Sequence, residues 1–190
     1  MKLLFITSNK HKFREAERVL KRYGIILLHV SLRCPEIRAD TCDEIALTSA
    51  SWVLKKLNHR RKLRPFILED AGLFIRALNG FPGTYSAWVH GKLGNEGILK
   101  LMSGARNRRA EFVTALAYFD GNKRKKIKII TGSCAGRISL RARGKGGYGY
   151  DPMFIPENHD KTFAEDLETK ARVSHRVRAL EKLGRRVFHG

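Results

Sequence analysis

The sequence predicts an α/β fold with a mixed central sheet and flanking helices. Short apolar runs of strand length alternate with amphipathic segments through the first half of the chain, which is typical of parallel strands connected by helices. In the second half, residues 109–120 and 126–132 alternate around a Gly121-Asn122 turn, as paired antiparallel strands do. The 190 residues, 43% of them hydrophobic, suit a single domain over 1–190.

The composition indicates the class of protein, and it includes a high positive charge that the sequence does not explain. No apolar stretch reaches about eighteen residues, and the amino terminus turns polar too early for a signal-peptide core, so we expect a cytoplasmic protein without a membrane segment. Cys34, Cys42 and Cys134 form no zinc spacing and suggest no disulfide framework. The formal net charge of +20 favours an anionic ligand. It also leaves non-specific nucleic-acid binding open.

The first strand is expected at residues 2–7, and a helix is expected at 12–23 after the turn and cap residues Ser8 and Asn9. A helix start of this kind directs free N–H groups and the positive dipole end toward the region above the strand, and Lys12 adds a full charge. The pattern indicates a phosphate site, although no glycine-rich phosphate loop is present. A second strand is expected at 25–30 and a second helix at 44–57.

The stretch from residue 66 to 88 organises the rest of the chain. Residues 66–68 read as a buried strand, so Glu69 and Asp70 are expected at its carboxyl end, where α/β sheets place their ligands. Two carboxylates there suggest a metal. The alternative is that Glu69 caps a turn and Asp70 caps a helix beginning near Gly72.

The remaining elements follow in order. A turn is expected at 80–83, a helix at 95–102 with Asn95 as its cap, further strands at 135–140 and 153–155, and a last helix at 167–183. A glycine-rich loop occupies 144–151.

Seven short motifs carry a resemblance that covers residues 2–180. They are Thr7-Ser8-Asn9 with Lys12, Pro35-Glu36-Ile37, Glu69-Asp70-Ala71-Gly72-Leu73, Leu78-Asn79-Gly80-Phe81-Pro82-Gly83, Gly147-Tyr148-Gly149-Tyr150-Asp151-Pro152, Thr162-Phe163-Ala164-Glu165 and Ser174-His175-Arg176. In this order they resemble the inosine triphosphate pyrophosphatase family.

The resemblance implies a two-lobed α/β fold around a nucleotide-binding cleft, usually a homodimer. It implies Mg²⁺-dependent attack of water on the α-phosphorus of ITP, dITP or XTP, which gives the monophosphate and pyrophosphate. Asp70 matches the family's base and metal ligand, Glu36 a second Mg²⁺ ligand, and Glu69 is expected to share the metal shell. The triphosphate-binding turn matches Thr7, Ser8, Asn9, Lys10, His11 and Lys12.

The nucleobase contacts implied by the resemblance lie late in the chain, at Tyr148, Gly149, Tyr150, Asp151, Lys170, His175 and Arg176. Taken without the family, these residues read as ordinary surface or helix positions. Ala71 replaces a usual serine, so its phosphate contact has to come from backbone or water. Tyr148 replaces phenylalanine, Ala171 replaces asparagine, and Thr48 and Ser49 stand where many relatives carry a lysine.

Two other functions remain open from the residues. The charge alone would fit a nucleic-acid-binding protein without catalysis, although no zinc-finger or aromatic RNA-binding signature accompanies it. A general nucleotide phosphatase would release orthophosphate where a pyrophosphatase releases pyrophosphate.

Overall fold

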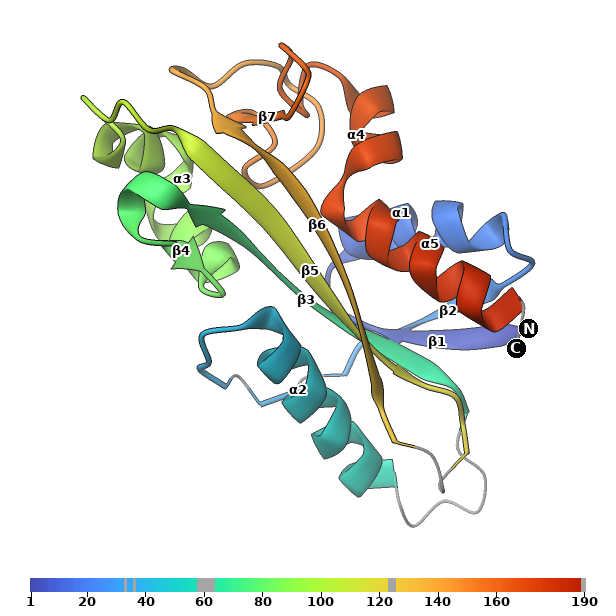
Figure 1. The fold of residues 1–190 in the computed structure, drawn as a ribbon. Helices are drawn as coiled ribbons and strands as arrows, with labels where there is room; N and C mark the ends of the chain where they lie inside the picture. Colours follow the sequence, from blue (N-terminus) through green and yellow to red (C-terminus); the bar gives the residue numbers. More distant parts are fainter. Residues whose placement is uncertain (33, 36, 58–63, 123–125, 189–190) are drawn as a thin grey trace. The chain divides into compact units, whose positions relative to one another are not determined.

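The computed structural model describes all residues except 33, 36, 58–63, 123–125 and 189–190. Its strands form a seven-stranded sheet in the order β2-β1-β3-β5-β6-β7, and β4 pairs with β3 (Figure 1). β1 is parallel to both β2 and β3, whereas β4 is antiparallel to β3 and β7 to β6. The predicted mixed sheet with flanking helices is confirmed. None of the described helices is long and apolar enough to cross a membrane.

The chain divides into two compact units. Unit 1 comprises residues 1–70, 114–132 and 176–190, and unit 2 comprises 71–113 and 133–175. Three strands contribute residues to both units: β3 (Phe66–Ile75), β5 (Arg109–Phe119) and β6 (Lys128–Ile138). Each unit has its own apolar core. The assignment of 1–190 to one functional domain stays a prediction.

Unit 1 is built on β1 (Lys2–Ile6) and β2 (Ile26–Val30). The helices α1 (Lys10–Lys21) and α5 (His175–Phe188) bury their apolar faces in one core with these strands, through side chains such as Leu20 and Leu183. Figure 1 shows α2 (Cys42–Leu57) on the other side of the sheet. Both faces of the parallel strands are therefore covered, as their continuous apolar sequence requires.

Unit 2 carries β4 (Pro82–Gly83), β7 (Phe154–Pro156), α3 (Ser86–Leu101), α4 (Leu167–Val173) and the short 3₁₀ helix η1 (Arg76–Leu78). Its core contains aromatic rings packed against one another. The ring centroids of Phe112 and Phe154 are 4.7 Å apart, and those of Phe154 and Phe163 are 5.2 Å apart. Gly72 is needed for close packing, because a Cβ there would lie 2.3 Å from the carbonyl oxygen of Gly83.

The structure corrects several predicted boundaries. The strands expected at 126–132 and 135–140 form one strand, β6. β3 does not end at residue 68, so Glu69 and Asp70 lie in mid-strand, and no helix begins near Gly72 for Asp70 to cap. α3 begins at Ser86 and is broken at Gly94, immediately before the predicted start at Asn95. The predicted last helix is two helices, because Ser174 adopts an extended conformation between α4 and α5. β3 continues because β4 pairs with it at Leu73 and Phe74, and α3 breaks where Gly94 adopts a positive φ.

Candidate functional site

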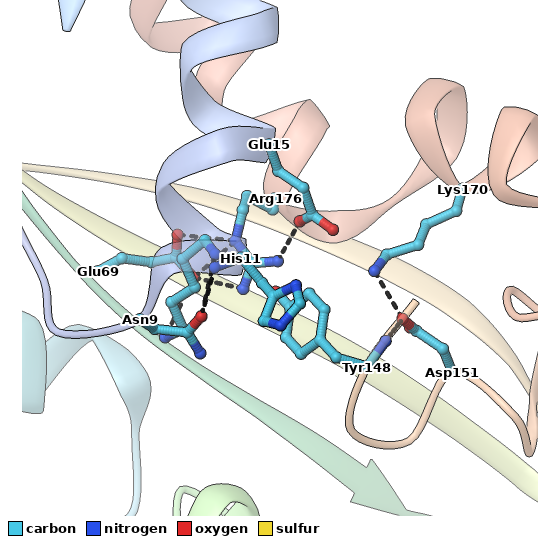
Figure 2. Close-up of polar contacts among 9 residues, drawn as sticks. Asn9, His11, Glu15, Glu69, Tyr148, Asp151, Lys170 and Arg176 are labelled. Atoms are coloured by element: carbon cyan, nitrogen blue, oxygen red, sulfur yellow. Dashed lines mark hydrogen bonds and ion pairs between the residues drawn. The ribbon is translucent and has the colours of Figure 1, made fainter. Parts of the chain in front are cut away.

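The first candidate segment is the turn between β1 and α1. Asn9 caps the helix, because its side-chain oxygen accepts hydrogen bonds from the backbone N–H of His11 at 2.9 Å and of Lys12 at 3.1 Å (Figure 2). Thr7 fixes the turn by accepting from the N–H of Asn9 at 3.1 Å. The predicted cap is confirmed. Because the cap already uses two of the free N–H groups, an anion bound here depends more on the side chains of this turn than on the helix end.

Glu69 is the most tightly held carboxylate of unit 1. Its side chain is fully buried, and Arg176 donates to it from Nε at 3.0 and 2.9 Å and from Nη2 at 2.7 Å (Figure 2). Lys12 Nζ lies 3.4 Å from the same carboxylate. Burial by itself would raise the pKa of Glu69, but the charges of Arg176 and Lys12 outweigh it and lower the pKa. Glu69 is therefore ionised at neutral pH.

Asp70 follows Glu69 in β3, just past the end of the parallel ladder between β1 and β3, whose last paired residues are Phe5 and Ile67. Its Oδ2 atom is buried. The thiol of Cys42, at the start of α2, forms a hydrogen bond to Asp70. Burial, followed by the charge of Asp70, raises the pKa of Cys42 well above its usual range, so the thiol keeps its proton and donates it to the carboxylate.

A second cluster of candidate residues lies in unit 2. Lys170 Nζ is 2.7 Å from Oδ2 of Asp151, and both side chains are buried (Figure 2). The same ammonium lies 4.3 Å from the centre of the Tyr148 ring, a cation–π contact. Asp151 also accepts from the backbone N–H of Tyr148 at 2.7 Å. The structure thus brings Tyr148, Asp151 and Lys170 together, and the nucleobase contacts that the resemblance implies for them stay predictions.

The glycine-rich loop that carries Tyr148 is shaped by close backbone packing. Gly147 has φ +70°, and a Cβ there would lie 2.1 Å from Oδ2 of Asp151, so only glycine leaves room for the ion pair. Thr162 and Glu165 cap each other, at 2.8 and 3.2 Å, and the Thr162 hydroxyl donates to the carbonyl of Arg143 at the start of the loop. The motif at residues 162–165 therefore supports the loop.

Three other predicted site residues make contacts with side chains or backbone groups of the protein itself. Tyr150 is buried in the core of unit 2, where its hydroxyl donates to the carbonyl of Ser86 at 3.0 Å. His175 is buried and stacks on Phe112 with 4.6 Å between ring centroids. Arg176 places its guanidinium on carboxylates of unit 1. Substrate contacts of these three residues stay predictions.

The described carboxylates suit a magnesium ion that takes only a few of its ligands from the protein. Asp70 offers carboxylate oxygen atoms of the kind that Mg²⁺ prefers, whereas both oxygens of Glu69 already accept hydrogen bonds from Arg176. No group of three or more potential metal ligands occurs among the described residues. A nucleotide-bound Mg²⁺ does not need such a group, because it takes most of its ligands from water and substrate phosphates. Glu36 lies outside the described residues.

Two neighbours of the acidic pair were missed by sequence reasoning. Glu15 on α1 forms an ion pair with Nη1 of Arg176 at 2.5 Å, although 161 residues separate them. Cys42, which no sequence motif marks as a site residue, forms a hydrogen bond to Asp70. No local pattern signals either contact, because both depend on elements that meet only in the folded chain.

The comparisons with known proteins agree with the motifs. A family model described as "Ham1 family" matches residues 3–186. The dITP/XTP pyrophosphatase of Methanopyrus kandleri is 48% identical over 96% of this chain and 94% of its own, and that of Thermococcus kodakarensis is 45% identical over 96% and 95%. Among solved structures, a HAM1 protein from Coxiella burnetii aligns with a TM-score of 0.84 at 28% identity over 100% of both chains. The Staphylococcus aureus Ham1 protein aligns with a TM-score of 0.82 at 26% identity over 98% of both. The chain therefore belongs to the Ham1 family.

Proposed function

We propose that this protein hydrolyses deaminated purine nucleoside triphosphates, dITP, ITP and XTP, to the monophosphate and pyrophosphate. The observation that carries the proposal is the adjacent pair Glu69 and Asp70, with Glu69 held ionised in the interior by Arg176 and Lys12. A fold does not need a buried carboxylate with two cations, because such clusters give little net stability. The relatives named above are dITP/XTP pyrophosphatases and match nearly the whole chain.

Unit 1 supplies the phosphate chemistry. Asp70 takes a proton from the attacking water, the new bond forms between the water oxygen and the α-phosphorus, and the bond from that phosphorus to the bridging oxygen breaks. Pyrophosphate leaves with the electron pair of that bond. Lys12, on the first turn of α1, offers its ammonium to the departing phosphates, together with Lys10 and the polar side chains of Thr7, Ser8 and His11. Glu69, which Arg176 holds in place, pairs with Lys12 and positions it.

A divalent metal, Mg²⁺ in this proposal, would be held by Asp70 and Glu36, with Glu69 at the edge of its shell. When bound, it supplies positive charge against the phosphate oxygens and lowers the pKa of coordinated water. Cys42 is a poor ligand for this hard cation and donates its hydrogen bond to Asp70 instead.

Unit 2 supplies the recognition of the base. Tyr148 offers a ring face, and Lys170 places a buried positive charge beside that ring. Hypoxanthine and xanthine carry an acceptor oxygen at position six, which an ammonium or N–H group satisfies, whereas adenine carries an amino donor there. A buried donor facing another donor is penalised, so adenine is rejected.

Product analysis tests the proposal directly. The purified protein is incubated with ITP, XTP and dITP at fixed Mg²⁺, and monophosphate, pyrophosphate and orthophosphate are measured separately. Monophosphate and pyrophosphate in equal amounts support it. Release of orthophosphate with diphosphate would favour the general phosphatase, and absence of turnover on all three nucleotides would overturn the enzymatic assignment.

Homodimer formation is part of the proposal and has an observation that supports it. Phe81, Tyr85 and Trp88 are 39%, 43% and 65% exposed within eight residues of unit 2. Exposed aromatic groups this close together are typical of surfaces that a partner covers. Light scattering on wild type and on Trp88→Lys checks this: a dimer that becomes a monomer in the variant supports it, and a wild-type monomer refutes it. Replacing the exposed Leu140 by lysine is the matched control, because it changes charge and apolar area elsewhere in unit 2.

A further inference from the structure

The positive charge of the chain is concentrated in unit 1. Of the 38 Lys and Arg residues, 25 fall in unit 1, against 10 of the 18 Asp and Glu residues, which gives this unit a formal charge of +15 out of +20. The phosphate chemistry proposed above uses only a few of these cations. Most of the excess charge therefore has no role in the reaction.

The outer faces of α1 and α5 carry much of this excess. We call these side chains the basic face: Lys10, Arg14, Arg18, Lys21, Arg22, Arg178, Lys182, Arg185 and Arg186, all exposed. The two helices contain three acidic residues, and two of them are paired: Glu15 with Arg176, and Glu181 with Arg22 at 3.0 Å. The basic face thus keeps a large net positive charge after pairing.

The cations form two stripes. On α1 the residues Lys10, Arg14 and Arg18 are spaced four apart, and on α5 Arg178, Lys182 and Arg186 repeat this spacing. Like charges at this spacing destabilise a helix, so folding alone does not favour the arrangement. Glu15 contacts Arg176 and, two turns later on α1, Arg22 contacts Glu181, so the two helices run side by side in the same direction. Figure 1 shows the same arrangement within unit 1.

The dimensions of the basic face match a nucleic-acid duplex. The α1 stripe from Lys10 to Arg18 spans roughly 12 Å at the rise of an α-helix. Packed helices lie about 8–10 Å apart, and long lysine and arginine side chains extend this separation toward the major groove of B-DNA, which is about 12 Å wide. The two stripes can then reach the phosphates on both sides of that groove. A-form RNA presents a narrow major groove instead, so its phosphate rows match the stripes less well.

Other polyanions fit the basic face poorly. The apolar sides of α1 and α5, among them Leu20 and Leu183, are buried in the core, so neither helix has a face left to insert into a membrane. Single-stranded nucleic acid is bound largely by stacking on aromatic rings. Phe188, at the very end of α5, is the one strongly exposed aromatic side chain on these two helices.

We propose that the basic face binds the phosphate backbone of double-stranded DNA without reading its sequence, and that it shares only Lys10 with the proposed phosphate site. No side chain of the basic face is placed to read base edges selectively. The expected affinity is that of a non-specific site, in the range of about 1–100 µM at physiological salt, and it falls steeply as salt rises.

Fluorescence anisotropy with a labelled DNA duplex tests this. In the variant Arg18→Gln, Lys21→Gln, Arg185→Gln, Arg186→Gln, we expect the slope of log K against log salt to shrink by about 3–4, since each phosphate contact contributes about 0.9. The control Lys92→Gln, Lys100→Gln, Arg106→Gln, Arg141→Gln removes the same charge from exposed positions of unit 2. The control is expected to keep the wild-type slope, and ITP turnover is expected to be unchanged in both variants, which shows that they fold.

Equal weakening in the two variants would overturn the proposal, because net charge and not the basic face would then govern binding. Tighter binding of single-stranded DNA, of duplex RNA or of anionic vesicles than of the DNA duplex would overturn it as well. Absence of ITP turnover by the wild-type protein would refute the proposed function, and the DNA-binding result would still stand.

Discussion

Replacing Arg176 by methionine removes the main partner of a buried charge. Arg176 is 3% exposed and makes three hydrogen bonds to Glu69, whose side chain is fully buried. Breaking a buried pair from one side costs about 3–5 kcal/mol, because the remaining ion loses its compensation without regaining water. We expect a loss of that size in the free energy of unfolding near neutral pH, with Lys12 reducing it toward the lower value.

The loss is expected to depend on pH in a defined direction. In wild type the pKa of Glu69 lies below 4.5, so its contribution to stability is complete above pH 4.5 and is lost as the pH falls through the folded-state pKa. In Arg176→Met, burial outweighs the remaining cation and raises the pKa of Glu69, so the folded variant gains a proton that relieves the cost. The difference in unfolding free energy between wild type and variant should therefore shrink as the pH falls, first as the variant gains its proton above the ordinary pKa of glutamate and then as Glu69 of wild type is protonated below it.

The loss in the free energy of unfolding is measured by urea unfolding in a Trp88→Phe background. The signal is then the fluorescence of Trp52, which lies in unit 1. The matched control is Arg22→Met, which breaks an exposed ion pair with Glu181 at 3.0 Å and should cost less than about 1 kcal/mol. Adding Glu69→Gln to Arg176→Met should recover part of the loss, because no charge is then left buried. A loss below about 1 kcal/mol, or one that is the same at about pH 7 and pH 4, would refute the role given to this pair.

Three further predictions concern activity. Asp70→Asn should lower kcat by far more than tenfold while nucleotide binding persists, since the amide cannot accept the proton; a rate above about a tenth of wild type, only ~1.4 kcal/mol in barrier, would contradict the assignment. Lys12→Ala should weaken triphosphate binding more than monophosphate binding in calorimetric titrations, and equal losses would remove Lys12 from the phosphate site. For base choice, kcat/KM for ITP and XTP should exceed the values for ATP and GTP by at least about a hundredfold, measured as pyrophosphate release at matched Mg²⁺. Comparable values for ITP and GTP would show that the base subsite does not discriminate.

The fold class was predictable because local sequence encodes it strongly. The apolar run at residues 2–7 and the cap at Asn9 each act within a few residues, and the structure confirms a strand and a helix start there. The boundary of β3 was not predictable in the same way. Glu69 and Asp70 look like a strand end, but the strand continues because β4 pairs with it at Leu73 and Phe74. That pairing is a tertiary contact with no local signal.

The sequence by itself determined the class of fold, the acidic pair at Glu69 and Asp70 and the order of the motifs that place the chain in its family, since each of these is encoded within a short segment. Only the tertiary structure decided which groups the charged side chains contact. It brought Arg176 to Glu69 across 107 residues and to Glu15 across 161, set the Cys42 thiol on Asp70 and gathered Lys170, Tyr148 and Asp151. The physical reason is that the free energy of a buried charge depends on its neighbours in space, and chain spacing does not specify those neighbours.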